Sequence, residues 1–240
     1  KVAILLMNCL EWLPIYFGIL KTGAIAVPFN FRFSADEIKY CADLAEVHIL
    51  MFGPEFIGRI ESIEEDLSKG RLLIYVGDGC PTFAESYREL VADCSSQPPL
   101  VRLDDDDDAA IYFSSGTTGF PKAILHNHES LMQAAQMEQK HHETSRDDVF
   151  LCIPPLYHTG AKFHWMGSLC AGSRAVLLKE RHRRSSWMLF PRNTARLCGC
   201  WFHGLRISST AWIAAISSWK TTIWISGDLC ISAHSRYRHH

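Results

Sequence analysis

The sequence predicts an α/β fold in which helices flank a mostly parallel sheet. Through the first 180 residues, short apolar runs rich in β-branched residues alternate with stretches of helical spacing, and Gly, Pro or Ser separate them. The chain has 240 residues, of which 48% are hydrophobic, so it can bury a substantial core. Its formal net charge of −2 points away from nucleic acid and from an anionic membrane as partners.

Each predicted element has a local justification. Gly23 follows Lys21 and marks the end of the first helix. Ser34 with Glu37 three residues later predicts a capping box at the start of the second helix. The expected strands are Val2–Met7, Ala24–Val27, Val47–Phe52, Leu72–Val76, Ala109–Phe113, Ala123–Leu125 and Ala175–Leu178. The expected helices are Glu11–Lys21, the stretch from Ser34 to Asp43, Glu55–Lys69, Phe83–Val91 and Glu129–Gln139.

The N-terminal segment and the cysteines bear on where the protein resides. The stretch Val2–Leu20 is apolar, but Asn8, Glu11 and Pro14 interrupt it, which favours a buried strand and helix over a membrane span. The nine cysteines are scattered, as expected for a reduced, cytoplasmic protein. Because the chain starts at Lys1 and enters an apolar run at once, we expect a fragment whose start lies upstream.

A loop rich in hydroxyl groups and glycines follows the strand Ala109–Phe113. It reads Ser-Ser-Gly-Thr-Thr-Gly-Phe-Pro-Lys over residues 114–122. Backbone N–H groups, hydroxyl donors and one lysine at such a turn are suited to holding a polyphosphate. The order differs from the common P-loop, in which the lysine directly follows a glycine. Asp104–Asp108, just before the strand, lacks the alternating spacing of a calcium loop and is expected to be a solvated loop.

This loop closely resembles the phosphate-binding signature of the adenylate-forming superfamily, which includes the acyl-CoA synthetases. Two further segments resemble the family in the right order: Leu20–Pro28 upstream and Pro155–Gly160 downstream. The resemblance covers most of residues 1–180 and implies a partial N-terminal adenylation domain. It implies an acid–thiol ligase, most like a medium-chain, long-chain or aryl acyl-CoA synthetase. The implied reactants are ATP with Mg²⁺, a carboxylic acid and coenzyme A.

The resemblance also assigns site residues. Seven positions are expected to grip the β- and γ-phosphates of ATP, namely Ser114, Ser115, Gly116, Thr117, Thr118, Gly119 and Lys122. His158 matches the position that lines the carboxylate and adenylate pocket, and no residue is expected to hold a resident metal. An ordinary loop histidine remains an alternative for His158, and His142 with Asp147 fits a generic acyltransferase spacing. A noncatalytic module that binds a nucleotide or an acyl group is the alternative for the whole chain.

The last sixty residues differ from the rest. Residues 181–240 carry one acidic residue, Asp228, against nine Lys and Arg, and five of the seven Trp. The family's adenine and ribose segments and its lysine-bearing C-terminal domain are not recognisable. If plausible codons for 200–209 are read one nucleotide earlier, they give Leu-Leu-Val-Pro-Trp-Ala-Gln-Asp-Ile-Leu, which resembles such a synthetase. We therefore expect 181–240 to be an out-of-frame or disordered tail that does not form a domain, and this chain to be inactive alone.

Overall fold

The computed structural model describes residues 1–67, 69–114, 119–152 and 154–178, and four short stretches at 197–199, 202–205, 222–225 and 231–234. Contacts divide the chain into two compact units. Unit 1 comprises Lys1–Met7 and Glu11–Ser130, and unit 2 comprises Asn8–Leu10 and Leu131–His240. No helix among the described residues has the length and apolar character that a membrane span requires.

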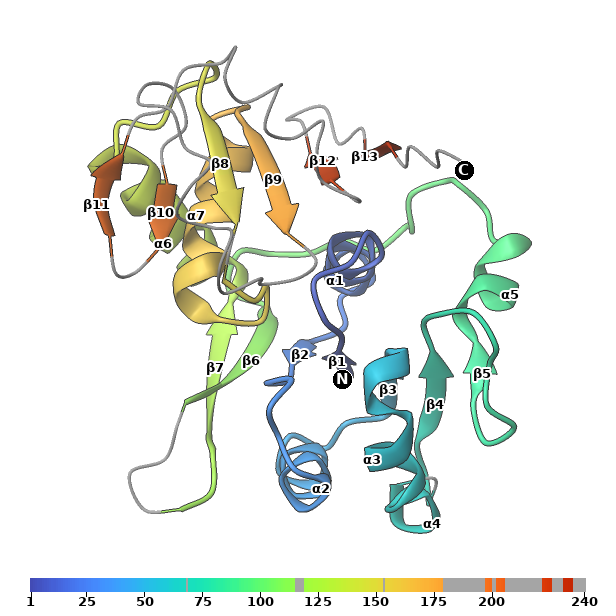
Figure 1. The fold of residues 1–240 in the computed structure, drawn as a ribbon. Helices are drawn as coiled ribbons and strands as arrows, with labels where there is room; N and C mark the ends of the chain where they lie inside the picture. Colours follow the sequence, from blue (N-terminus) through green and yellow to red (C-terminus); the bar gives the residue numbers. More distant parts are fainter. Residues whose placement is uncertain are drawn as a thin grey trace. The chain divides into compact units, whose positions relative to one another are not determined.

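Unit 1 contains a seven-stranded sheet with the order β5-β4-β3-β1-β2-β6-β7 (Figure 1). The strands are β1 (Val2–Leu5), β2 (Ala26–Pro28), β3 (Ile49–Phe52), β4 (Leu72–Tyr75), β5 (Glu85–Ser86), β6 (Asp108–Ser114) and β7 (Lys122–Asn127). Neighbouring strands pair in parallel, except that β6 and β7 are antiparallel. The predicted α/β fold with a mostly parallel sheet is therefore confirmed.

Helices cover both faces of this sheet. They are α1 (Trp12–Lys21), α2 (Ala35–Leu44), the 3-10 turn η1 (Pro54–Phe56), α3 (Ile57–Glu61), α4 (Glu64–Leu67) and α5 (Tyr87–Ala92). Ile111 of β6 belongs to one apolar cluster with Ile38 of α2 and Ile60 of α3. The next residue, Tyr112, points to the opposite face, where its hydroxyl donates to the hydroxyl of Tyr16 on α1 at 3.0 Å. Burial on both faces explains why β1, β2, β3 and the centre of β6 are continuous apolar runs.

Two helix predictions in unit 1 had different outcomes. The capping box is confirmed, because the Ser34 N–H donates to Glu37 Oε2 at 2.8 Å and the Glu37 N–H donates to Ser34 Oγ at 3.3 Å. The single helix expected over Glu55–Lys69 is wrong, since η1, α3 and α4 divide this stretch. The break lies at Ser62, whose hydroxyl donates to the Arg59 carbonyl at 2.8 Å. Such local side-chain bonds compete with the helical hydrogen bonds.

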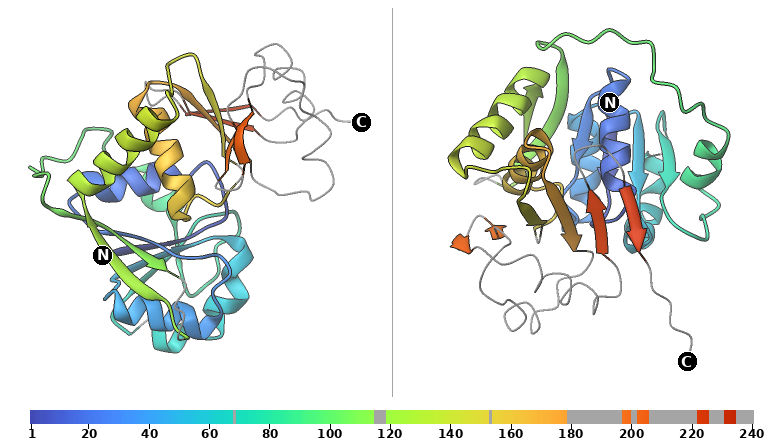
Figure 2. Two further views of the ribbon diagram at one scale, coloured as in Figure 1. Left: turned by 90° about the vertical axis from the view of Figure 1, so that its left-hand side faces the viewer. Right: turned by 90° about the horizontal axis from the view of Figure 1, so that it is seen from above.

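Unit 2 contains the remaining described elements. These are most of α6 (His128–His141), followed by β8 (Val149–Cys152), α7 (Thr159–Cys170), β9 (Arg174–Leu178), β10 (Leu197–Gly199), β11 (Phe202–Leu205), β12 (Thr222–Ile225) and β13 (Ile231–His234). A four-stranded sheet has the order β13-β12-β9-β8, and α7 packs against β8 and β9 (Figure 2). Helix α7 was not among the elements predicted from the sequence.

The expected tail over residues 181–240 lies mostly outside the described residues. The structure describes β10, β11, β12 and β13 within it. β12 pairs with β9 in an antiparallel register that joins Thr222 to Leu178. The out-of-frame origin of this stretch stays a prediction.

Candidate functional site

The candidate phosphate loop connects β6 to β7, which pair as antiparallel strands in unit 1. Ser114, the last residue of β6, is the Cα partner of Lys122, the first residue of β7. Antiparallel pairing therefore fixes the two ends of the loop opposite each other. Ser114 is half-buried and Lys122 is exposed, so the lysine side chain is accessible to a ligand in solvent.

The second half of this loop has a defined backbone. Gly119 has a backbone φ of 121°, a conformation that residues with a Cβ atom strongly disfavour. Phe120 is 54% exposed, and its ring lies 4.5 Å from the ring of Tyr40, measured between centroids. Pro121 is buried next to the start of β7. The glycine is thus required by the chain path, and the Phe120–Tyr40 contact anchors the loop to α2.

The first half of the loop lies outside the described residues. It comprises Ser115, Gly116, Thr117 and Thr118, four of the seven positions assigned to phosphate binding. The structure places the other three, Ser114, Gly119 and Lys122, on the described flanks of the loop. The assignment of all seven stays a prediction.

His158 is the N-cap of α7 in unit 2. Its Nδ1 accepts a hydrogen bond from the Gly160 N–H at 3.2 Å, so in this arrangement the ring proton resides on Nε2. The side chain is exposed. This hydrogen bond is what an ordinary loop histidine would make, and it leaves Nε2–H available as a donor. The predicted role of His158 in a carboxylate pocket stays a prediction.

Asn8 fixes the segment that leads to His158. Its Nδ2 donates to the Pro154 carbonyl at 3.3 Å, and its Oδ1 accepts from the Leu156 N–H at 2.9 Å. Asn8 is 7% exposed, so these bonds are largely shielded from water. In the sequence Asn8 only interrupted an apolar run, and its partners lie 146 and 148 residues away.

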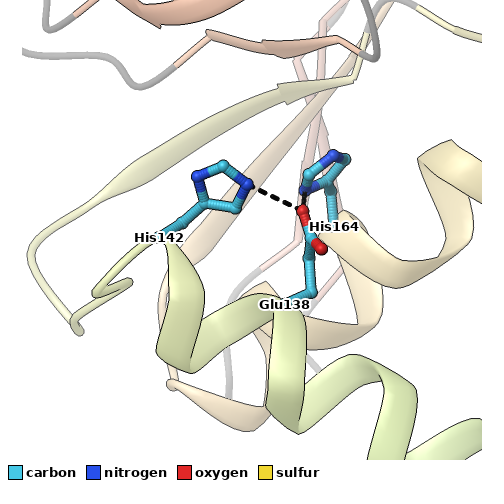
Figure 3. A group of neighbouring side chains, drawn as sticks. All are labelled: Glu138, His142 and His164. Atoms are coloured by element: carbon cyan, nitrogen blue, oxygen red, sulfur yellow. Dashed lines mark ion pairs between the residues drawn. The ribbon is translucent and has the colours of Figure 1, made fainter.

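Three side chains that the sequence did not bring together meet between α6 and α7 of unit 2. His142 Nε2 and His164 Nδ1 each lie 2.8 Å from Glu138 Oε1 (Figure 3). Burial lowers the pKa of His164, while the Glu138 carboxylate opposes this shift. His142 thus contacts Glu138 and His164, whereas the acyltransferase alternative paired it with Asp147. The four-residue spacing of Glu138 and His142 could be read from the sequence, but the approach of His164 to this pair could not.

Lys162 of α7 is a buried charged residue that was not predicted from the sequence. The side chain is fully buried, and its Nζ lies 4.5 Å from the centre of the Phe163 ring. Desolvation lowers the pKa of Lys162 to about 8. A cation over an aromatic face regains part of the lost hydration energy.

Comparison with known proteins identifies relatives over most of the chain. The family model of AMP-binding enzymes matches residues 1–198. A crotonobetaine/carnitine–CoA ligase of Escherichia coli is 29% identical over 208 residues, which cover 83% of this chain and 40% of the relative. The long-chain-fatty-acid–CoA ligase FadD13 of Mycobacterium tuberculosis is 27% identical over 190 residues, covering 79% of this chain and 37% of the relative. The chain thus spans about two fifths of the length of these relatives.

Solved structures resemble the chain as well. The inhibitor-bound N-terminal domain of FACL13 from Mycobacterium tuberculosis aligns with a TM-score of 0.67 and 26% identity, covering 75% of this chain and 44% of that one. The anthranilate–CoA ligase AuaEII, in complex with anthranoyl-AMP, aligns with a TM-score of 0.67 and 25% identity, covering 75% and 35%. ATP-bound MatB from Rhodopseudomonas palustris aligns with a TM-score of 0.64 and 25% identity, covering 75% and 35%.

Proposed function

The chain belongs to the AMP-binding enzyme family, and from this premise we propose that it is part of an ATP-dependent acid–thiol ligase. The observation that carries the proposal is the β6–β7 hairpin, where Ser114 and Lys122 close a loop with the family's phosphate signature. The family is that of the adenylate-forming acyl-CoA ligases, which use ATP and coenzyme A.

In this proposal the loop holds the β- and γ-phosphates of ATP. Lys122 supplies a positive charge at the first position of β7, and the hydroxyl groups of Ser114, Ser115, Thr117 and Thr118 supply donors. Gly116 and Gly119 let the backbone approach the phosphates closely. Fixed donors stabilise the negative charge that develops on the leaving pyrophosphate, and they need no reorganisation during the reaction.

The proposed reaction has two steps. A carboxylate oxygen of the acid attacks the α-phosphorus of ATP, and the bond from that phosphorus to the pyrophosphate oxygen breaks. The thiol of coenzyme A, as its thiolate, then attacks the acyl carbon, and AMP leaves with the bridging oxygen. His158 would line the pocket near the carboxylate, where its Nε2–H can donate a hydrogen bond. Mg²⁺ would enter with the phosphates of ATP, and we assign no residue of this chain to it.

The partners follow from this chemistry. They are a carboxylic acid, ATP and coenzyme A, with no nucleic acid, and the setting is the cytoplasm. We further propose that the 240-residue polypeptide by itself binds ATP without forming an acyl thioester. The support is that the adenine and ribose segments of the family are not recognisable in it.

Substitution of Lys122 tests the phosphate assignment. We expect Lys122→Ala to weaken ATP binding at least tenfold in calorimetry, because charge-assisted hydrogen bonds contribute about 1.5–3 kcal/mol each. Lys69→Ala is the matched control, since Lys69 is 77% exposed and belongs to the same unit. Inorganic triphosphate should compete with ATP, and AMP should compete much less. Equal ATP affinity of the parent and Lys122→Ala would exclude the loop as the phosphate site.

A pyrophosphate-exchange assay separates the ligase from the noncatalytic binding module. Ligase chemistry predicts exchange of labelled pyrophosphate into ATP that depends on added carboxylic acid, once the missing family segments are supplied by a longer form of the protein. A binding module predicts ATP binding with no exchange in either form. Acyl-CoA formation by the 240-residue polypeptide alone would overturn the proposal that it is inactive.

A further inference from the structure

Glu138, His142 and His164 form a compact group of potential metal ligands in unit 2. Their ligating atoms all lie within 4.8 Å of one another (Figure 3). Both imidazole nitrogens approach the same atom, Glu138 Oε1, at 2.8 Å. Imidazole nitrogen and carboxylate oxygen are the ligand types found in zinc sites of enzymes.

Glu138 and His142 are placed by helix geometry. The His142 N–H donates to the Glu138 carbonyl at 3.0 Å, so the helical hydrogen-bond pattern of α6 continues through His142. Residues four apart lie on one face of a helix. The two side chains therefore point in the same direction without a separate support.

His164 is brought to this face by the packing of α7 against α6. A Cβ added at Gly167 would lie only 2.9 Å from the Ala135 carbonyl oxygen, so the two helices approach closely at these positions. One turn farther along, Cys170 Sγ lies 3.5 Å from Met132 Sδ. The group of ligands thus rests on two packed helices, which hold a site more accurately than loops do.

We propose that Glu138, His142 and His164 bind a divalent transition-metal ion, with zinc as the best fit. Imidazole ligands favour zinc, copper, nickel and similar ions, whereas magnesium and calcium prefer oxygen ligands. Tetrahedral zinc with bonds of about 2.0–2.2 Å separates its ligand atoms by about 3.3 Å. The N···O distances of 2.8 Å would need to open by only about half an ångström, which side-chain rotation provides.

The fourth position would be open to water. The side chains of His142, Glu138 and His164 are 35%, 27% and 11% exposed, so the group is accessible from solvent. Without metal, His142 Nε2 and His164 Nδ1 both face the Glu138 carboxylate. To bind the ion, each ring offers a lone pair at that nitrogen, so a proton held there moves to the other ring nitrogen or is released to solvent.

Metal titration of the full 240-residue chain tests this site. After treatment with a chelator, we expect the chain to bind zinc and to show the visible absorption of tetrahedral cobalt when Co²⁺ is added. Glu138→Gln keeps a hydrogen-bond acceptor for both rings, and we expect it to weaken zinc binding at least tenfold while preserving the circular dichroism spectrum. His142→Ala and His164→Ala should have the same effect on zinc.

Controls distinguish this site from other histidines and from the cysteines. His141→Ala, which removes the exposed neighbouring ring, and Lys122→Ala should bind zinc as the parent does. Zinc should protect His142, and not His141, from acylation by diethyl pyrocarbonate in peptide mapping of the unmutated chain. Unchanged zinc affinity in Glu138→Gln, no protection of His142, or a cobalt spectrum dominated by thiolate bands would each overturn the proposal.

Discussion

Lys162 on α7 is fully buried, although a lysine is charged in water at neutral pH. Desolvation lowers its pKa from 10.5 to about 8, so below pH 8 the native protein must hold a buried cation. The shift corresponds to an upper limit of about 3 kcal/mol of lost stability. Between about pH 8 and 10.5 the unfolded chain binds a proton that the folded chain does not, so stability rises with pH in this window.

Replacing Lys162 removes that penalty. We expect Lys162→Met to raise the free energy of unfolding at pH 7 by about 1–3 kcal/mol, because it keeps the volume and removes the buried charge. The gain should shrink as the pH rises from 8 and should be absent above pH 10.5. Urea denaturation at several pH values measures both effects. Parallel stability curves for the parent and the variant would contradict this account.

Among individual residues, those of the candidate site could be predicted from the sequence only in part. The hydroxyl, glycine and lysine pattern indicated the phosphate loop because its ligands are contiguous in the chain. Asn8 and His164 were missed because their roles depend on partners that are distant in sequence and come together only through packing. Gly167, which permits the close approach of α6 and α7, has no local signal either.

Among the secondary-structure elements, α2 has the clearest sequence-encoded start. Two reciprocal hydrogen bonds between Ser34 and Glu37 satisfy N–H groups that the first helical turn leaves without intrahelical acceptors. Ile38, Cys41 and Ala42 of α2 are completely buried in the core of unit 1. The cap therefore stabilises an element on which that core depends.

Removing the Ser34 side chain should destabilise the protein. We expect Ser34→Ala to lower the free energy of unfolding by about 1 kcal/mol, and Ser34→Asp to have little effect because aspartate caps equally well. Thermal and urea denaturation of the three proteins give the comparison. A stable alanine variant alongside a destabilised aspartate variant would show that the cap does not act as described.

Local signals also explain which elements were predicted correctly. Strands β1 to β4 and β6 were located because their buried residues form continuous apolar runs. The helix expected over Phe83–Val91 is wrong in its first half, where β5 (Glu85–Ser86) precedes α5 (Tyr87–Ala92). The break in Glu55–Lys69 was missed because hydrophobic periodicity persists across it, while a single serine hydroxyl interrupts the backbone pattern. The α7 helix lacked a clear apolar periodicity because a charged residue, Lys162, occupies a buried position one turn before the buried Trp165.

For the whole molecule, the parallel order of the sheet followed from the alternation of strands and helices. The β6–β7 pair departs from this parallel order, because its strands are antiparallel. This pairing places Ser114 and Lys122, the two ends of the candidate phosphate loop, opposite each other. The family match ends at residue 198, beyond the predicted boundary at residue 180. The basic, Trp-rich composition continues from there to the end.

The coding DNA tests the proposed frame change. We expect that the nucleotides across Lys179 to His203, read one position earlier, encode sequence similar to acyl-CoA ligases, because plausible codons for 200–209 already do so. Sequencing the DNA of this region shows directly whether the reading frame changes. If both alternative frames give unrelated sequence, residues 181–240 are a genuine extension of the protein.

The hydrogen bonds of Asn8 also determine how the protein can be divided. Unit 2 includes Asn8–Leu10, a short piece of chain that lies between β1 and α1 of unit 1. A polypeptide that starts at Leu131 would therefore lack the acceptor for the Leu156 N–H and the donor for the Pro154 carbonyl. During synthesis, likewise, Asn8 leaves the ribosome long before its partners and stays without them until the chain has grown past Leu156. The segment that carries His158 can therefore form its hydrogen bonds to Asn8 only late in synthesis, and only in a polypeptide that contains both Asn8 and Leu156.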